Sequence, residues 1–122
     1  MLVRRADEME GQAVEMEGVK DIEMRLLLGR SDGAPTFAMR HFTVQPGGHS
    51  PKHQHPYEHG VLVLHGAGTV EVDGETHRLQ PGDSLFIEPN ALHQFRADCG
   101  ESLEFMCMVP TSFDCGKPTP GS

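Results

Sequence analysis

The stretch that decides the fold runs from Gly47 to Gly66 and reads GGHSPKHQHPYEHGVLVLHG. Its histidines His53, His55 and His59 have a spacing that suits a metal site. Side chains at positions i and i+2 of an extended segment point to the same face, so His53 and His55 can approach one point. A turn before the apolar run at 61–64 can then return His59 toward the other two.

Neutral imidazole is the commonest protein ligand for mid-sized divalent metals. Pro56 and Tyr57 supply the break between the second and third histidines of the stretch. We therefore predict a metal site here. The alternative interpretation is a polar loop with scattered surface histidines.

Composition narrows the function classes. The chain has 122 residues, 23% of them charged, and a formal net charge of −8. A nucleic acid or an anionic membrane surface as partner requires basic patches, so neither is expected. No apolar run approaches the roughly 20 residues of a membrane span.

The compartment is predicted from the ends of the chain and the cysteines. The N-terminus, MLVRRADE, lacks the apolar core of a secretory signal. Cys99, Cys107 and Cys115 are odd in number and have no CxxC spacing, so a disulfide framework is not expected. We expect the reducing cytoplasm.

Strand signals extend along the whole chain, because Gly and Pro separate short runs of apolar and β-branched residues. Residues 46–48, Pro-Gly-Gly, should end the second strand, and Asp73-Gly74 should form a tight hairpin turn. The expected strands cover residues 22–28, 37–44, 61–64, 69–72, 76–79, 84–87, 92–95 and 103–109.

Many short strands at a spacing of about 8–12 residues predict an all-β sandwich or barrel. We expect one domain. Residues 1–30 are predicted to form an N-terminal arm and first strand of that domain, and residues 31–110 the barrel. Residues 111–122 are predicted to be a disordered tail.

A fourth histidine joins the site by alternation. In the segment ALHQF, His93 and Phe95 share a face, so a strand that buries Phe95 also turns His93 inward. An unpaired polar group inside costs roughly 1–3 kcal/mol, so His93 needs a partner. A backbone carbonyl is one possibility, and the metal site is the other.

Two motifs in this sequence resemble those of the cupins. The first is Gly47-x5-His53-x-His55-x3-His59-x6-Gly66, in which His59 stands where most cupins have glutamate. The second is Gly82-x5-Glu88-x-Asn90-x2-His93-x3-Ala97, which departs from the cupin pattern at Glu88, Asn90 and Ala97. The resemblance implies a double-stranded β-helix, the cupin jelly-roll barrel. Asn90 is the mildest departure, because Asn tolerates the left-handed conformation.

The likeness is closer to small single-domain cupins that hold manganese through four histidines. It extends from about residue 20 to residue 110 and includes APTFAMRHFTVQPGG at residues 34–48. It implies that one divalent metal, manganese first, is bound by His53, His55, His59 and His93. Iron, nickel, copper and zinc are the other metals to consider.

Three further residues are expected around the ligands. Glu58 could replace His59 as a ligand, but we favour a carboxylate that receives an imidazole N–H or pairs with Arg40. Cys107 shares a face with Phe105, so it should line the barrel as a small buried residue or as a redox-sensitive neighbour of the metal. His41 is expected to be solvated.

Two functions are compatible with this site. The first is a metal-dependent oxidoreductase or dioxygenase acting on a small, oxygen-containing and anionic organic molecule. The second is a non-catalytic module that binds or senses a small molecule. A homodimer is also expected, because residues 1–30 exceed what a minimal barrel needs and an open sheet edge favours pairing with a second copy.

Overall fold

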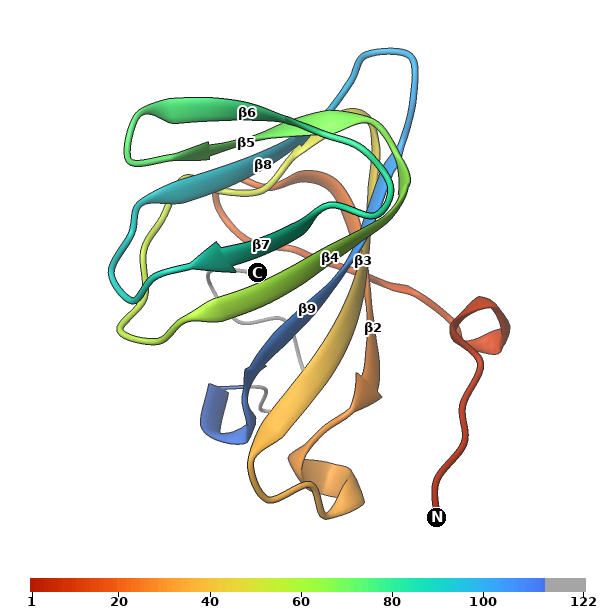
Figure 1. Cartoon of the computed structure of the whole chain (residues 1–122). Coiled ribbons are helices and arrows are strands. Elements are labelled where there is room, and N and C mark those ends of the chain that lie inside the picture. Colours follow the sequence, from red (N-terminus) through yellow and green to blue (C-terminus); the bar gives the residue numbers. More distant parts are fainter. Residues whose placement is uncertain (114–122) are drawn as a thin grey trace.

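The computed structural model (Figure 1) describes residues 1–113 of the chain. Within this part, one antiparallel sheet has the strand order β6-β5-β8-β3-β9-β4-β7, with β2 paired to β3 and β1 paired to β2. The strands are β1 (Gln12–Ala13), β2 (Lys20–Leu28), β3 (Phe37–His49), β4 (His59–Gly66), β5 (Gly68–Val72), β6 (Glu75–Leu79), β7 (Ser84–Ile87), β8 (His93–Ala97) and β9 (Leu103–Pro110).

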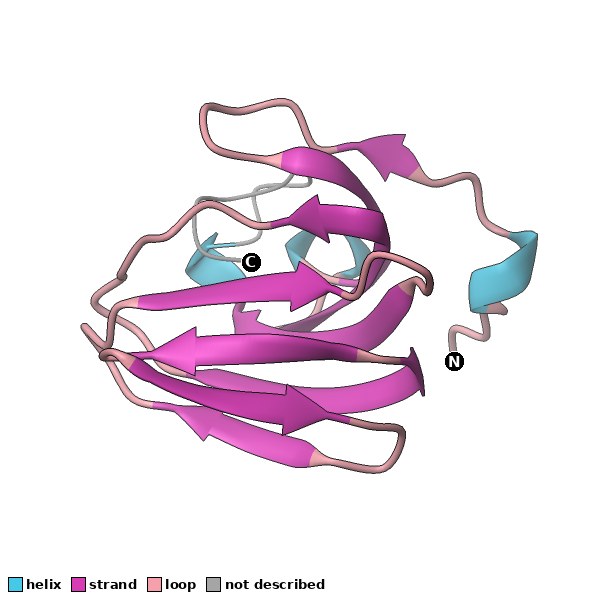
Figure 2. Cartoon of the chain, turned by 90° about the horizontal axis from the view of Figure 1, so that it is seen from above, coloured by secondary structure: helices cyan, strands magenta, loops and turns pink. Residues whose placement is uncertain are grey.

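The sheet curls into two layers. Figure 1 shows β6, β5 and β8 above β7, β4 and β9, and Figure 2 shows the molecule from above, with the strands in magenta. The described helices are single 3-10 turns: η1 (Ala6–Glu8), η2 (Arg30–Asp32) and η3 (Thr111–Phe113). The predicted all-β jelly-roll barrel is therefore confirmed. No helix among residues 1–113 is long and apolar enough to span a membrane.

Alternating burial places the core between the layers. Along β9 the side chains alternate between buried and partly buried positions, and β4 has the same period along its first five residues. Phe105 of β9 stacks on Phe42 of β3 and on Phe95 of β8, with ring centroids 5.4 and 4.5 Å apart. These rings join the two layers, because β3 and β9 lie in one and β8 lies in the other.

The second strand is longer than predicted. β3 continues through residues 46–48, which were expected to end it, as far as His49. Gly47 has φ +77°, so the Pro-Gly-Gly segment at residues 46–48 bends the strand and does not end it. A Cβ at position 48 would lie 2.6 Å from the carbonyl oxygen of Lys20, so only glycine permits the close approach of β2.

The bend lets one strand serve both layers. Before it, β3 pairs with β9 from Phe37 to Val44. After it, His49 pairs with Arg96 of β8. The chain thereby leaves the lower layer and enters the upper one immediately before the histidine stretch.

The N-terminal arm lies outside the barrel core. Arg4 in the N-terminal arm forms an ion pair with Asp32, with 2.7 Å between Nη2 and Oδ1. The predicted tail begins with the 3-10 turn η3. Its remaining residues, 114–122, lie outside the described part, so the expectation of disorder stays a prediction for them.

Gly66 at the end of β4 provides a test of the packing. Its φ is +89°, and a Cβ there would collide with the Ser102 carbonyl. We expect Gly66→Ala to lower the free energy of unfolding by about 2–3 kcal/mol or more, measured by urea denaturation. Gly60→Ala on the same strand is the control, because no atom lies within 4 Å of its added Cβ. Equal stability of the two variants would contradict this account.

Candidate metal centre

The histidine stretch is held against β8 by its backbone. His53 forms an antiparallel bridge with His93: the His53 amide donates to the His93 carbonyl at 3.1 Å, and the His93 amide donates to the His53 carbonyl at 2.9 Å. The Asn90 amide donates to the His55 carbonyl at 2.6 Å. Asn90 has φ 68°, as its place in the second motif predicted. Two segments about forty residues apart are thus fixed side by side.

These bonds bring three imidazoles into position to hold a metal ion. One ring nitrogen from each of His53, His55 and His93 lies within 4.8 Å of the other two. His59, the first residue of β4, adjoins them, with ring centroids 5.4 Å from His55 and 5.0 Å from His93. All four predicted residues therefore meet at one end of the barrel. The role of His59 as fourth ligand stays a prediction.

The protonation of these rings suits a metal. The Nδ1–H of His93 can donate to the Ala91 carbonyl at 2.9 Å, which leaves Nε2 with its lone pair. Burial, followed by the neighbouring histidines, lowers the pKa of His53 to about 3. Burial and the charges of His93 and Arg40 lower the pKa of His59 to about 3. Both rings are therefore neutral at pH 7.

Ring nitrogens of the centre are buried without a hydrogen bond in the described part of the chain. Within residues 1–113, Nε2 of His53 and Nε2 of His59 are buried and have no hydrogen-bond partner. A buried polar atom without a partner costs about 1–3 kcal/mol, so a native site normally has a reason for it. Coordination of a divalent cation satisfies such lone pairs, so these residues fit a metal.

Cys107 and Arg40 are buried beside His59. Cys107 is buried in the barrel, as predicted, and its Sγ lies 3.3 Å from Nδ1 of His59. Nη2 of Arg40 lies 3.9 Å from the same sulfur, and Cζ of Arg40 lies 5.3 Å from the centre of the Phe42 ring. Burial raises the pKa of the Cys107 thiol, although Arg40 acts in the opposite direction.

Glu58 and Arg40 lie in different environments. The Glu58 side chain is exposed, whereas Arg40 is completely buried. The expected roles of Glu58, as a partner of an imidazole or of Arg40, remain predictions. His41 was wrongly expected to be solvated. It is buried on the outer side of β3, 3.2 Å from the Glu104 carboxylate, and burial lowers its pKa.

Tyr57 is a site residue that the sequence analysis missed. It is buried and stacks on the His55 ring, with centroids 5.0 Å apart and planes at 15°. It also lies 5.2 Å from the His59 ring. The sequence analysis gave it only a strand-breaking role. The available signal was its position, since the single tyrosine of the chain stands between two predicted ligands.

Comparison with known families agrees with this geometry. The family described as "Cupin domain" matches residues 40–109. The chain belongs to the cupin family. Among curated relatives, the 1-methylthio-D-xylulose 5-phosphate methylsulfurylase of Rhodospirillum rubrum is 40% identical over 79 residues, which are 65% of this chain. This cupin spans about half (51%) of that enzyme.

Solved structures share the fold over most of the chain. The polyketide cyclase RemF of Streptomyces resistomycificus has a TM-score of 0.86 at 29% identity, covering 91% of this cupin and 80% of RemF. A cupin-2 domain from Rhodospirillum rubrum has a TM-score of 0.78 at 32% identity, covering 89% of this cupin and 74% of that chain. The names of the methylsulfurylase and of the polyketide cyclase describe different reactions.

Proposed function

We propose that this cupin is a metal-dependent oxidoreductase, of dioxygenase type, acting on a small oxygen-containing anionic molecule. The observation that supports the proposal is the convergence of four histidine rings, of which His53 and His59 are neutral at pH 7 and have a buried Nε2 without a hydrogen-bond partner among the described residues. His53, His55, His59 and His93 would hold one divalent metal, with manganese first among the candidates. When bound, the metal supplies positive charge that polarises and orients an oxygen ligand.

The residues around the centre restrict the reaction class. Among residues 1–113, no Asp or Glu side chain is buried, so the site has no enclosed carboxylate for acid–base work. Tyr57 packs against His55, the Ala91 carbonyl holds His93, and Cys107 contacts His59. These contacts orient the imidazoles. This favours a reaction at the metal over a carboxylate-assisted isomerisation or decarboxylation.

The same lack of an enclosed carboxylate also fits the second candidate, a binding or sensor module without turnover. The two are separated by incubating the metal-loaded protein with candidate acids under air and following both ligand binding and product formation. Binding with no product from any acid would favour the module.

We expect metal affinity to depend on all four histidines. His53→Ala, His55→Ala, His59→Ala and His93→Ala should each weaken manganese binding by about 100-fold or more, since losing even a residue that supports a ligand costs about 10–100-fold. Isothermal titration calorimetry measures this. His77→Ala is the control, because His77 is an exposed residue of β6. Unchanged affinity in His93→Ala would remove the second motif from the site.

The side chain at position 59 sets the net charge of the metal centre, which should affect how strongly the metal binds anions. Four neutral imidazoles leave the full 2+ charge on the metal, whereas a glutamate at position 59 would reduce it by one. We expect His59→Glu to retain metal and to bind oxalate at least about fivefold more weakly. His59→Gln separates loss of the imidazole from gain of the negative charge. Equal oxalate affinity in parent and His59→Glu would show that charge is not what His59 contributes.

A homodimer is proposed from the outer face of the lower layer. Phe86 of β7 is 67% exposed and Leu62 of β4 is 37% exposed. Met106 and Met108 of β9 continue the same face, opposite Leu62 and Gly60 in the strand pairing. Apolar faces of this kind mark contacts between proteins. β2 pairs with β3 of its own chain, so exchange between copies would involve the arm before it.

The dimer is tested by light scattering. We expect the parent to have the mass of two chains, and Leu62→Lys or deletion of residues 1–17 to shift it toward one. Thr76→Lys, on exposed β6 in the other layer, is the control. A parent mass of one chain would exclude the dimer.

A reducing, cytoplasmic compartment is proposed from the cysteines. Cys99 and Cys107 are both free thiols, one exposed and one buried. Free exposed thiols are stable where glutathione keeps them reduced.

A further inference from the structure

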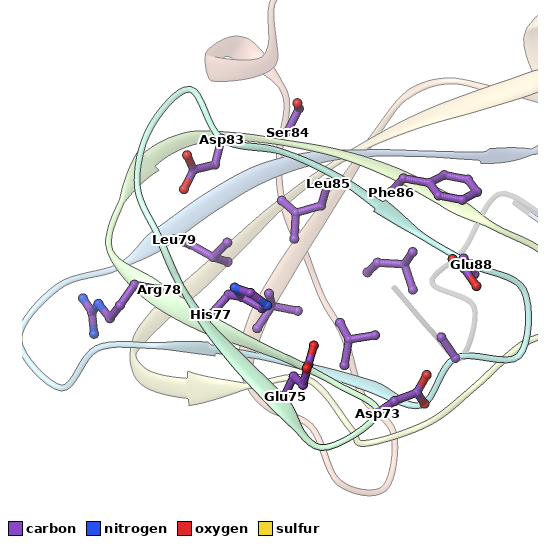
Figure 3. A pocket seen from close by; sticks show the side chains of 14 residues that line it. Asp73, Glu75, His77, Arg78, Leu79, Asp83, Ser84, Leu85, Phe86 and Glu88 are labelled. Carbon is purple, nitrogen blue, oxygen red and sulfur yellow. The ribbon is translucent and has the colours of Figure 1, made fainter.

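A cleft of about 600 Å³ lies between β6 and β7, the strands at the two ends of the sheet order (Figure 3). Its apolar lining includes Val72, Leu79, Leu85 and Ile87. Figure 3 shows the side chains of Leu79 and Leu85 directed into the space between the strands. The volume is in the range of small-molecule sites, which run from about 300 to 1,000 Å³.

The inner end of this cleft adjoins the metal centre. Val72 pairs with His93 across β5 and β8, and Ile87 pairs with His59 across β7 and β4. Side chains of directly opposite residues share a face, with Cβ atoms about 4.5–5.5 Å apart. Ala91 also lines the cleft, and its carbonyl accepts the hydrogen bond from His93. The lining of the cleft is thus one strand away from two of the imidazoles, those of His59 and His93.

The outer rim of the cleft is acidic. Asp73 and Asp83 are engaged by the backbone amides of Leu92 and Gln80, whereas Glu75 and Glu88 are exposed. These four carboxylates form the rim in Figure 3 together with Arg78.

Two basic side chains, His77 and Arg78, stand against these four carboxylates, and the arginine is engaged elsewhere. The guanidinium of Arg78 forms an ion pair with Asp98 at 2.7 Å. The rim therefore repels a second negative charge on a ligand.

We propose that this cleft holds the apolar body of the substrate, that its oxygen end lies at the metal centre, and that the acidic rim rejects a further anionic group such as a phosphate. The inference rests on the proposed function, because it takes the imidazoles as the metal site. It deepens that proposal by giving the substrate class: an apolar molecule with a single metal-binding oxygen group.

Three hydroxamates test the cleft on the manganese-loaded protein, with affinities from calorimetry. Acetohydroxamate reports the metal alone, benzohydroxamate adds an apolar ring, and 4-carboxybenzohydroxamate adds a second anion at the far end. We expect benzohydroxamate to bind at least about tenfold more tightly than acetohydroxamate, because its apolar ring is transferred from water into the apolar cleft. The carboxylate of 4-carboxybenzohydroxamate should remove most of this gain in affinity, because the acidic rim repels it.

Variants assign these differences to the cleft. Leu85→Trp should fill it and abolish the advantage of benzohydroxamate while acetohydroxamate binds as before. Leu64→Trp, a partly buried position on the outer face of β4, is the matched control.

If Leu85→Trp does not fold, the exposed pair Glu75→Lys/Glu88→Lys still tests the rim. It should restore binding of 4-carboxybenzohydroxamate, and Glu10→Lys/Glu101→Lys should not.

The outcomes separate the two proposals. Equal affinities of acetohydroxamate and benzohydroxamate, with metal bound, would overturn the cleft assignment alone. A chain that takes up no metal would overturn the proposed function and this inference with it.

Discussion

The backbone bridge between His53 and His93 is the contact on which the site depends. Its two hydrogen bonds join the loop that follows β3 to the first residue of β8, so candidate ligands from both motifs are placed by main-chain geometry. The bend at Gly47, which carries β3 from one layer into the other, makes this bridge possible. Fold and site are therefore set by the same few residues.

Much of the site could be predicted because it follows from simple periodicity. His53 and His55 share a face, His93 shares a face with Phe95, and Asn90 takes the left-handed conformation expected of it. The strand positions were also predictable, since apolar runs and turn residues alternate clearly.

The predictions that were wrong or missing concern features that depend on tertiary contacts. Residues 46–48 looked like a strand end, because nothing local shows that β2 will pair with β3 both before and after the bend and that β8 will pair with it after the bend. His41 looked solvated, because its burial beside Glu104 requires β9 as a neighbour. Tyr57 was overlooked because stacking on a ligand ring leaves no periodic signal.

The contact between His59 and Cys107 restrains the orientation of the His59 ring only weakly. The ring of His93 is anchored on a carbonyl oxygen, a strong acceptor, whereas that of His59 rests on sulfur, a weak one. The rings of His59 and His93 are thus unequally restrained. If His59 is the fourth ligand, its ring is the one of this pair that can turn away from the ion more easily, while the ring of His93 keeps its place.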